Sequence, residues 1–244
     1  MFCRYALRTT DVDAARRFYS DVIGLDFGAD DASGLAVWPL HAQARARGAP
    51  AHWLGAIGVD DVEATLRRLL EAGGERLGPT VVAKDGSTWG NVRDPSGAVV
   101  SVRHGPRPSR AAPVAWHQLH TRDADAAWAL YSELFGWIHT ESFDAPDVDG
   151  GHRMFAWAGA RTSVGSMANT ARWPGVHPHW LFYFQVPDLD AALARAQASG
   201  ARPASHPVVL PNGARLVPCD DPQGGAFGLY EAKHPEATGP HSAG

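Results

Sequence analysis

The sequence predicts an α+β protein with two tandem domains, each built from two similar segments of strand, helix and further strands. Three observations predict this fold. The chain repeats itself, four segments carry the apolar spacing of a helix that covers a sheet, and strand segments alternate apolar and polar residues. Of the 244 residues, 45% are hydrophobic and 20% are charged, which is enough apolar content for a sizeable core.

The repeat defines the domains. Eight residues recur 112 positions later, so that Thr9, Asp11, Asp13, Ala14, Ala15, Tyr19, Ser20 and Gly24 match Thr121, Asp123, Asp125, Ala126, Ala127, Tyr131, Ser132 and Gly136. An offset of 127 residues relates the His-Trp-Leu run at 52–54 to that at 179–181. The Pro-rich stretch 106–112 is typical of a linker. We expect domains at 1–105 and 113–233 and a flexible tail at 234–244.

The four predicted helices follow one plan, because each has one apolar stripe between a capping residue and a stop signal. The first runs from a cap at Thr10 or Asp11 to Gly24. The second starts after Asp60 or Asp61 and stops at Gly73 or Gly74. The third and fourth are expected at about 123–135 and 188–199.

Alternation in the predicted strands separates two faces of each sheet. In residues 4–8, the apolar Tyr5 and Leu7 alternate with Arg4, Ala6 and Arg8. The segments 181–186 and 226–230 alternate in the same way. The apolar set is expected to pack against helices, and the second set either lines a pocket or is solvated.

The first segment is shorter than its repeat. Asp11 to Asp61 spans 50 residues, whereas Asp123 to Asp188 spans 65. The difference of 15 residues corresponds to a strand and a turn. We expect the first sheet to lack or shorten one strand, and its cavity to be shallower or more open than that of the second domain.

Three motifs carry a family resemblance. The run 9–19 (TTDVDAARRFY), followed by Ile-Gly-Leu at 23–25, the DPSG and DPQG turns at 94–97 and 221–224, and the run 48–55 (GAPAHWLG) resemble one known pattern. It is that of the tandem, two-domain branch of the vicinal oxygen chelate superfamily, which includes glyoxalase I, extradiol dioxygenases, and fosfomycin- and bleomycin-resistance proteins. The resemblance implies four βαβββ modules paired into two glyoxalase-like domains. Each would be a curved, mostly antiparallel sheet around a cavity, with helices outside.

The resemblance also implies where a divalent metal would be held. In metal-dependent members, ligands lie seven residues before the Asp that opens each helix of a domain, and seven after the Asp of the DPxG turn. These positions hold Arg4, Leu54 and Ser101 in the first domain, and Trp116, Leu181 and Gly228 in the second. Apart from the weak Ser101 hydroxyl, none is a usual ligand. No cofactor is predicted, and a divalent metal is the less favoured alternative.

Two sets of side chains are expected to line pockets. The set in the second domain comprises Trp116, Gln118, His120, Leu181, Tyr183, Gln185 and Tyr230. Aromatic rings with a few hydrogen-bonding groups are typical of small-molecule sites, so this domain is predicted to carry the functional pocket, with Trp116 as an anchor. His120 is the candidate general acid or base, the alternative being a structural histidine. In the first domain, Arg4, Arg8 and Arg103 would attract a carboxylate or phosphate, unless they form a solvated basic face.

Composition excludes several function classes. The 22 Lys and Arg against 26 Asp and Glu give a net charge of −4, which argues against a nucleic-acid partner. No apolar run is long enough for a membrane span and no signal peptide is readable. Two free cysteines are expected in a cytoplasmic protein, a monomer or homodimer. Three functions remain: metal-free binding of a small organic molecule, an enzyme of the superfamily with an atypical site (a glyoxalase-like lyase, hydroxylase or dioxygenase), or a structural or regulatory module.

Overall fold

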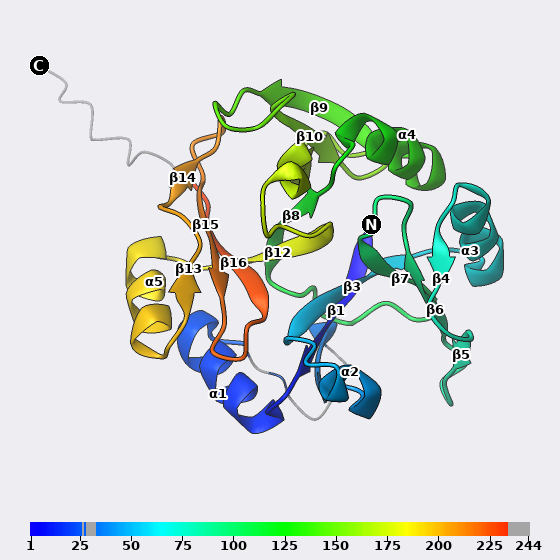
Figure 1. The fold of residues 1–244 in the computed structure, drawn as a ribbon, viewed down its shortest axis with the longest axis horizontal. Helices are drawn as coiled ribbons and strands as arrows, with labels where there is room; N and C mark the ends of the chain where they lie inside the picture. The colour runs from blue at the N-terminus through cyan, green and yellow to red at the C-terminus, as the bar shows by residue number, and fades with distance from the viewer. Residues whose placement is uncertain (26, 28–32, 234–244) are drawn as a thin grey trace, which may run out of the picture.

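The computed structural model describes residues 1–25, 27 and 33–233, and confirms the predicted fold of two sheets with helices (Figure 1). The predicted tail at 234–244 lies outside the described residues. In the first half the elements are β1 (Phe2–Thr9), α1 (Val12–Ile23), β2 (Leu35–Pro39), α2 (Ala42–Ala46), β3 (His52–Gly58), α3 (Val62–Glu71), β4 (Glu75–Arg76), β5 (Val81–Val82), β6 (Thr88–Arg93) and β7 (Val99–His104). In the second half they are β8 (Val114–His120), α4 (Ala124–Phe135), β9 (Ile138–Phe143), β10 (His152–Ala156), β11 (Gly165–Ala168), the 3-10 helix η2 (Asn169–Arg172), β12 (His179–Gln185), α5 (Leu189–Ala198), β13 (Arg202–Pro203), β14 (Val208–Val209), β15 (Arg215–Asp220) and β16 (Ala226–Glu231).

The four long helices begin in the same way. At each N-terminus an Asp carboxylate accepts a hydrogen bond of 2.9 Å from the backbone N–H three residues later; the four are Asp11, Asp61, Asp123 and Asp188. Such caps satisfy an N–H that the helix leaves without a partner. Gly24 and Gly136 end α1 and α4 in the left-handed conformation, with φ of 72° and 63°, which glycine adopts without strain.

Each domain contains one open sheet made of two modules. The first sheet has the strand order β2-β1-β3-β7-β6-β4, and the second has β13-β15-β16-β12-β8-β11-β10-β9. Two antiparallel contacts, β1 with β3 and β8 with β12, join the modules of each domain. In the described residues, no helix is long and apolar enough to span a membrane.

The first module differs from its repeat more than predicted. Three strands, β9, β10 and β11, follow α4, whereas β2 is the one strand between α1 and α2 among the described residues. We expected one strand to be lacking or shortened, whereas two are absent among the residues described there. The register shows which strand remains: β2 pairs parallel with β1 as β11 pairs parallel with β8.

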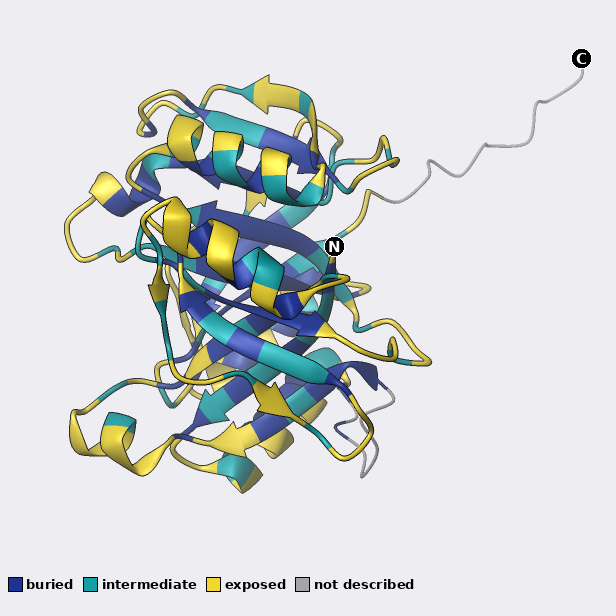
Figure 2. Cartoon of the chain, turned by 90° about the vertical axis from the view of Figure 1, so that its right-hand side faces the viewer, coloured by how far each residue is buried: buried dark blue, intermediate teal, exposed yellow. Residues whose placement is uncertain are grey.

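The two domains pack through their helix-covered faces. Helix α1 contacts α5, and α3 approaches α4, where Arg68 donates a 2.7 Å hydrogen bond to Glu133 (Figure 1). The rings of Phe2 and Phe182 meet at 5.4 Å in a core that both sheets share. Figure 2 shows buried sheets between helices whose solvent-facing sides are exposed. The face of each sheet opposite the helices, here called its outer face, therefore points away from the other domain.

Hydrogen bonds between buried groups repeat the symmetry of the chain across this interface. The Tyr19 hydroxyl donates to Asp221 at 2.9 Å, and the Tyr131 hydroxyl donates to Asp94 at the same distance. Burial raises the pKa of both carboxyl groups above the ordinary value, while these hydrogen bonds favour the charged form. The DPxG turn of each domain is thus tied to a helix of the other.

Candidate functional site

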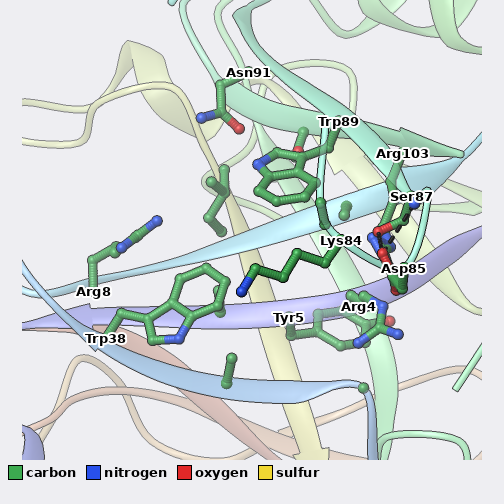
Figure 3. Close-up of a pocket in the computed structure, with 17 residues that line it drawn as sticks. Arg4, Tyr5, Arg8, Trp38, Lys84, Asp85, Ser87, Trp89, Asn91 and Arg103 are labelled. Atoms are coloured by element: carbon green, nitrogen blue, oxygen red, sulfur yellow. Dashed lines mark hydrogen bonds and ion pairs between the residues drawn. The ribbon is translucent and has the colours of Figure 1, made fainter. Parts of the chain in front are cut away.

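The outer face of the first sheet contains a cavity of about 380 Å³ (Figure 3). Its walls come from β1, β2, β3, β6, β7 and the turn at residues 83–87. Strand alternation explains most of the β1 lining: Arg4, Ala6 and Arg8 line the cavity, while Leu7 is buried in the core behind it. Tyr5 also contributes to the lining, although it is 6% exposed and belongs to the core. The cavity lies at the face that the sequence assigned to the polar set.

Small side chains create the space. The cavity is lined by Ala6, Ala36, Ala56, Ala83 and Ser101. These small residues lie on neighbouring strands and on the turn, so the space that larger side chains would fill stays empty. The described cavity thus lies in the first domain, whereas the functional pocket was predicted in the second.

The cavity lining contains four cationic side chains and one carboxylate. They are Arg4, Arg8, Lys84 and Arg103, and the carboxylate is Asp85. The guanidinium of Arg103, which is only 8% exposed, lies 3.9 Å from the Asp85 carboxylate. Hydrogen bonds from Ser87, and then the charge of Arg103, hold the pKa of Asp85 below its usual range. The cavity therefore carries a net positive charge.

Two indole rings accompany these cations. The Arg8 guanidinium lies 4.4 Å from the ring centre of Trp38, and that of Arg103 lies 5.9 Å from the ring centre of Trp89. Both separations are within the range of cation–π attraction. Burial lowers the pKa of Arg8, although a guanidinium stays protonated at neutral pH. The lining thus combines positive charge with flat aromatic surface.

The structure brings Arg4, Arg8 and Arg103, the three arginines predicted from the sequence, into one cavity. The sequence alone did not decide between such an anion site and a solvated basic face. Sequence reasoning missed Trp38, Lys84 and Trp89. The signal for Trp38 was alternation, since Leu35 and Val37 are buried and the alternate residues Ala36 and Trp38 face the cavity. The same period places Trp89 on the cavity side of β6.

The outer face of the second sheet is packed rather than hollow. Trp116 and Tyr183 are each 1% exposed, and they form an apolar cluster with Leu181, Leu210 and Met154. The Tyr183 hydroxyl donates a 2.7 Å hydrogen bond to the Gln118 side chain. Tyr230 stacks parallel to Trp116 with ring centres 6.4 Å apart, and Gln185 is exposed at the end of β12. The predicted aromatic pocket is a small second core.

The repeat explains the difference between the two outer faces. Tyr183 occupies the position of Ala56, and Leu210 that of Ala83, at the 127-residue offset. Gly228 allows this packing, because a Cβ at that position would lie 2.0 Å from the Tyr183 ring. Strand β10, which has no counterpart described in the first module, adds Met154.

His120, the predicted acid or base, lies outside the first-domain cavity. Its Nδ1 is 2.6 Å from the Thr170 hydroxyl, and its ring stacks on His179 with centres 4.5 Å apart. Burial, reinforced by neighbouring histidines, holds the pKa of His120 well below its usual range. The low pKa favours a neutral imidazole, which lies between the Thr170 hydroxyl and the His179 ring.

The six positions of the metal-ligand pattern do not fit a metal ion. In the first domain Arg4 is a cation, Leu54 is apolar, and the Ser101 hydroxyl donates a hydrogen bond to the backbone carbonyl of Gly90. In the second domain Trp116 and Leu181 are apolar and Gly228 has no side chain. Among the residues that the structure describes, no group of three or more His, Cys, Asp or Glu is placed to hold a metal.

With this geometry, comparison with known proteins identifies the family. The model of the Glyoxalase/Bleomycin resistance protein/Dioxygenase superfamily matches residues 2–102 and again 114–229. The chain belongs to this superfamily. The two matches correspond to the two sheets, in agreement with the tandem arrangement predicted from the repeat.

Two relatives of this chain carry names that refer to different activities. The chain is 28% identical over 245 residues to a putative glyoxylase, CFP32, of Mycobacterium tuberculosis, covering 92% of each chain. It is 27% identical over 192 residues to the anthracycline biosynthesis protein DauV of Streptomyces sp. (strain C5), covering 76% of this chain and 68% of that protein.

Solved structures show the same fold at lower identity. The Mn(II)-bound glyoxalase from Novosphingobium aromaticivorans has a TM-score of 0.67 at 14% identity, covering 94% of this chain and 81% of that one. The 2,3-dioxygenase LapB from Pseudomonas sp. KL28 has a TM-score of 0.65 at 14% identity, covering 97% and 93%. A manganese-bound glyoxalase therefore shares this fold. In this chain the six positions of the metal-ligand pattern hold Arg, Leu and Ser in the first domain and Trp, Leu and Gly in the second.

Proposed function

We propose that this protein binds a small organic anion in the first-domain cavity, without a metal ion. The single observation that carries the proposal is the convergence of four cationic side chains and two indoles on one cavity of about 380 Å³. That volume falls within the range of small-molecule sites. Arg4 occupies a ligand position of the metal-binding pattern that the family resemblance implies, so a guanidinium supplies positive charge there instead.

The indoles favour a ligand with a flat apolar part. Trp38 and Trp89 offer ring faces and edges beside the alkyl floor of Ala6 and Leu54. The name of one relative concerns anthracycline biosynthesis, and anthracyclines contain fused aromatic rings. We therefore take an aromatic carboxylate as the model ligand, because planar guanidinium groups bind carboxylates through two parallel hydrogen bonds.

Calorimetric titration with 2-naphthoate and its uncharged amide tests the proposal. The carboxylate is expected to bind at least about tenfold more tightly than the amide, because a charge-assisted hydrogen bond contributes about 1.5–3 kcal/mol. Raising the NaCl concentration should weaken the binding of the carboxylate and leave that of the amide nearly unchanged.

Two variants separate the cavity from general surface charge. Arg4→Gln should reduce naphthoate affinity about tenfold, since it removes a charged donor from the lining. Arg17→Gln removes the same charge from the exposed side of α1 and should leave the affinity unchanged. Equal binding of acid and amide, or equal loss in the two variants, would refute the proposed function.

A further inference from the structure

The positive groups of the cavity divide into two ends. Arg4 and Arg8 are four residues apart on β1, which separates their Cα atoms by ~13 Å. The register on β3 places Arg8 beside His52 and Arg103 beside Gly58, at opposite ends of that strand. Figure 3 shows Arg4 and Arg103 on one side of the cavity and Arg8 on the other.

Each end pairs an arginine with an indole. The Arg8 guanidinium lies 4.4 Å from the Trp38 ring centre at one end, and the Arg103 guanidinium lies 5.9 Å from the Trp89 ring centre at the other. The N–H groups of a guanidinium lie in its plane, where they match the two oxygens of a carboxylate. An arginine beside an indole therefore occurs twice in one cavity.

Between the two ends the lining is mainly apolar. Ala6 lies between Arg4 and Arg8 on β1, and it pairs with Leu54 on β3. Lys84 extends across this middle region in Figure 3, and its nitrogen lies on the Trp38 side, so its charge belongs to the Arg8 end. A flat apolar spacer fits this middle region, where Ala6, Leu54 and the alkyl stem of Lys84 offer apolar surface.

We infer that the preferred ligand is an elongated organic diacid, with one acidic group at each end and a flat apolar spacer between them. This inference rests on the proposed function and specifies its ligand class. A monoacid bound at the Arg4 and Arg103 end would leave the partly buried Arg8 facing apolar ligand surface. A second acidic group replaces that unfavourable contact by a charge-assisted hydrogen bond.

Calorimetry with two biphenyl acids tests the inference. One carries a single para carboxylate and the other carries a carboxylate at each far end, so they share the spacer and differ in one charge. The diacid is expected to bind about tenfold or more tightly, as one added charge-assisted hydrogen bond implies. Terephthalate, a shorter diacid, should bind more weakly than the biphenyl diacid because it cannot reach both ends.

Variants at each end make the result specific. Arg8→Gln and Arg4→Gln should each reduce the affinity for the biphenyl diacid about tenfold, to the level of the monoacid. For the monoacid, Arg4→Gln should have this effect, as for naphthoate, and Arg8→Gln should not. Arg17→Gln is the matched control for net charge, and the melting temperatures of all variants check that the fold is kept.

The outcomes separate the two proposals. Equal affinity for monoacid and diacid, with both weakened by Arg4→Gln, would overturn the diacid inference and leave the proposed function standing. A loss of diacid affinity in only one of the two variants would also overturn the inference. Failure of both acids and of naphthoate to bind at millimolar concentration would overturn the proposed function and the inference with it.

Discussion

Replacing Trp116 by alanine should destabilise the protein strongly. Trp116 is 1% exposed and packs with Leu181, Tyr183 and Met154, so its removal leaves a hole among groups that are already in contact. Truncation of a fully buried tryptophan costs about 3–5 kcal/mol. Trp38 is the comparison, because it is 44% exposed at the rim of the first cavity. Its truncation should cost about 1–2 kcal/mol, from the smaller buried area and the loss of the contact with Arg8.

Urea unfolding monitored by far-ultraviolet circular dichroism measures both free energies. Circular dichroism is preferred to tryptophan fluorescence, because each variant removes one of the nine fluorophores. A difference of about 2–3 kcal/mol between the two variants is expected from the figures above. If Trp116→Ala costs no more than Trp38→Ala, the second outer face is not a packed core, and the assignment of the cavity to the first domain loses its main structural contrast.

Three further predictions concern the interface and the metal question. Tyr5→Phe should cost about 1–3 kcal/mol, because the Tyr5 hydroxyl donates a 2.6 Å hydrogen bond to buried His117, and thermal unfolding would measure it. Burial lowers the pKa of His117 to about 4, whereas it is about 6.5 in the unfolded chain. The unfolded state therefore binds more protons, and the free energy of unfolding decreases as the pH is lowered below about 6.5. From pH 7 to pH 5 this histidine should contribute a loss of about 2 kcal/mol that His117→Gln lacks, and equal pH slopes in urea unfolding would contradict this. EDTA should leave the melting temperature unchanged, because the six ligand positions lack metal donors; a lower value after dialysis would contradict the metal-free account.

The sequence predicted the fold because the fold depends on repeated local signals. Four capping aspartates, apolar stripes and the two repeat offsets each specify structure within a short segment, and all four caps form as expected. The prediction for the first module was less accurate. A deficit of 15 residues indicates missing structure, but the length alone does not determine whether one strand or two are absent among the described residues.

The site was harder to predict because a large side chain on a sheet face can either line a pocket or fill it. Tyr183 and Trp116 on an outer face could either line a pocket or fill it, and alternation assigns only the face. Whether they fill it depends on Gly228 and on Met154 from β10, which are distant in sequence. The informative signal was the row of small residues in the first domain, among them Ala56, where a cavity can remain open.

Filling the first cavity tests the central claim most directly. Ala56→Leu combined with Ala83→Leu places larger apolar side chains in the cavity, as Tyr183 and Leu210 do in the second domain. Calorimetric titration of this double variant with 2-naphthoate should show a loss of at least about tenfold in affinity, since one buried Leu occupies space and contacts otherwise worth about 1.5–3 kcal/mol. Gln185→Leu, on the exposed edge of the second domain, should bind like the unaltered protein. Unchanged affinity in a folded double variant, or a loss in Gln185→Leu, would contradict the assignment of the ligand site to the first domain.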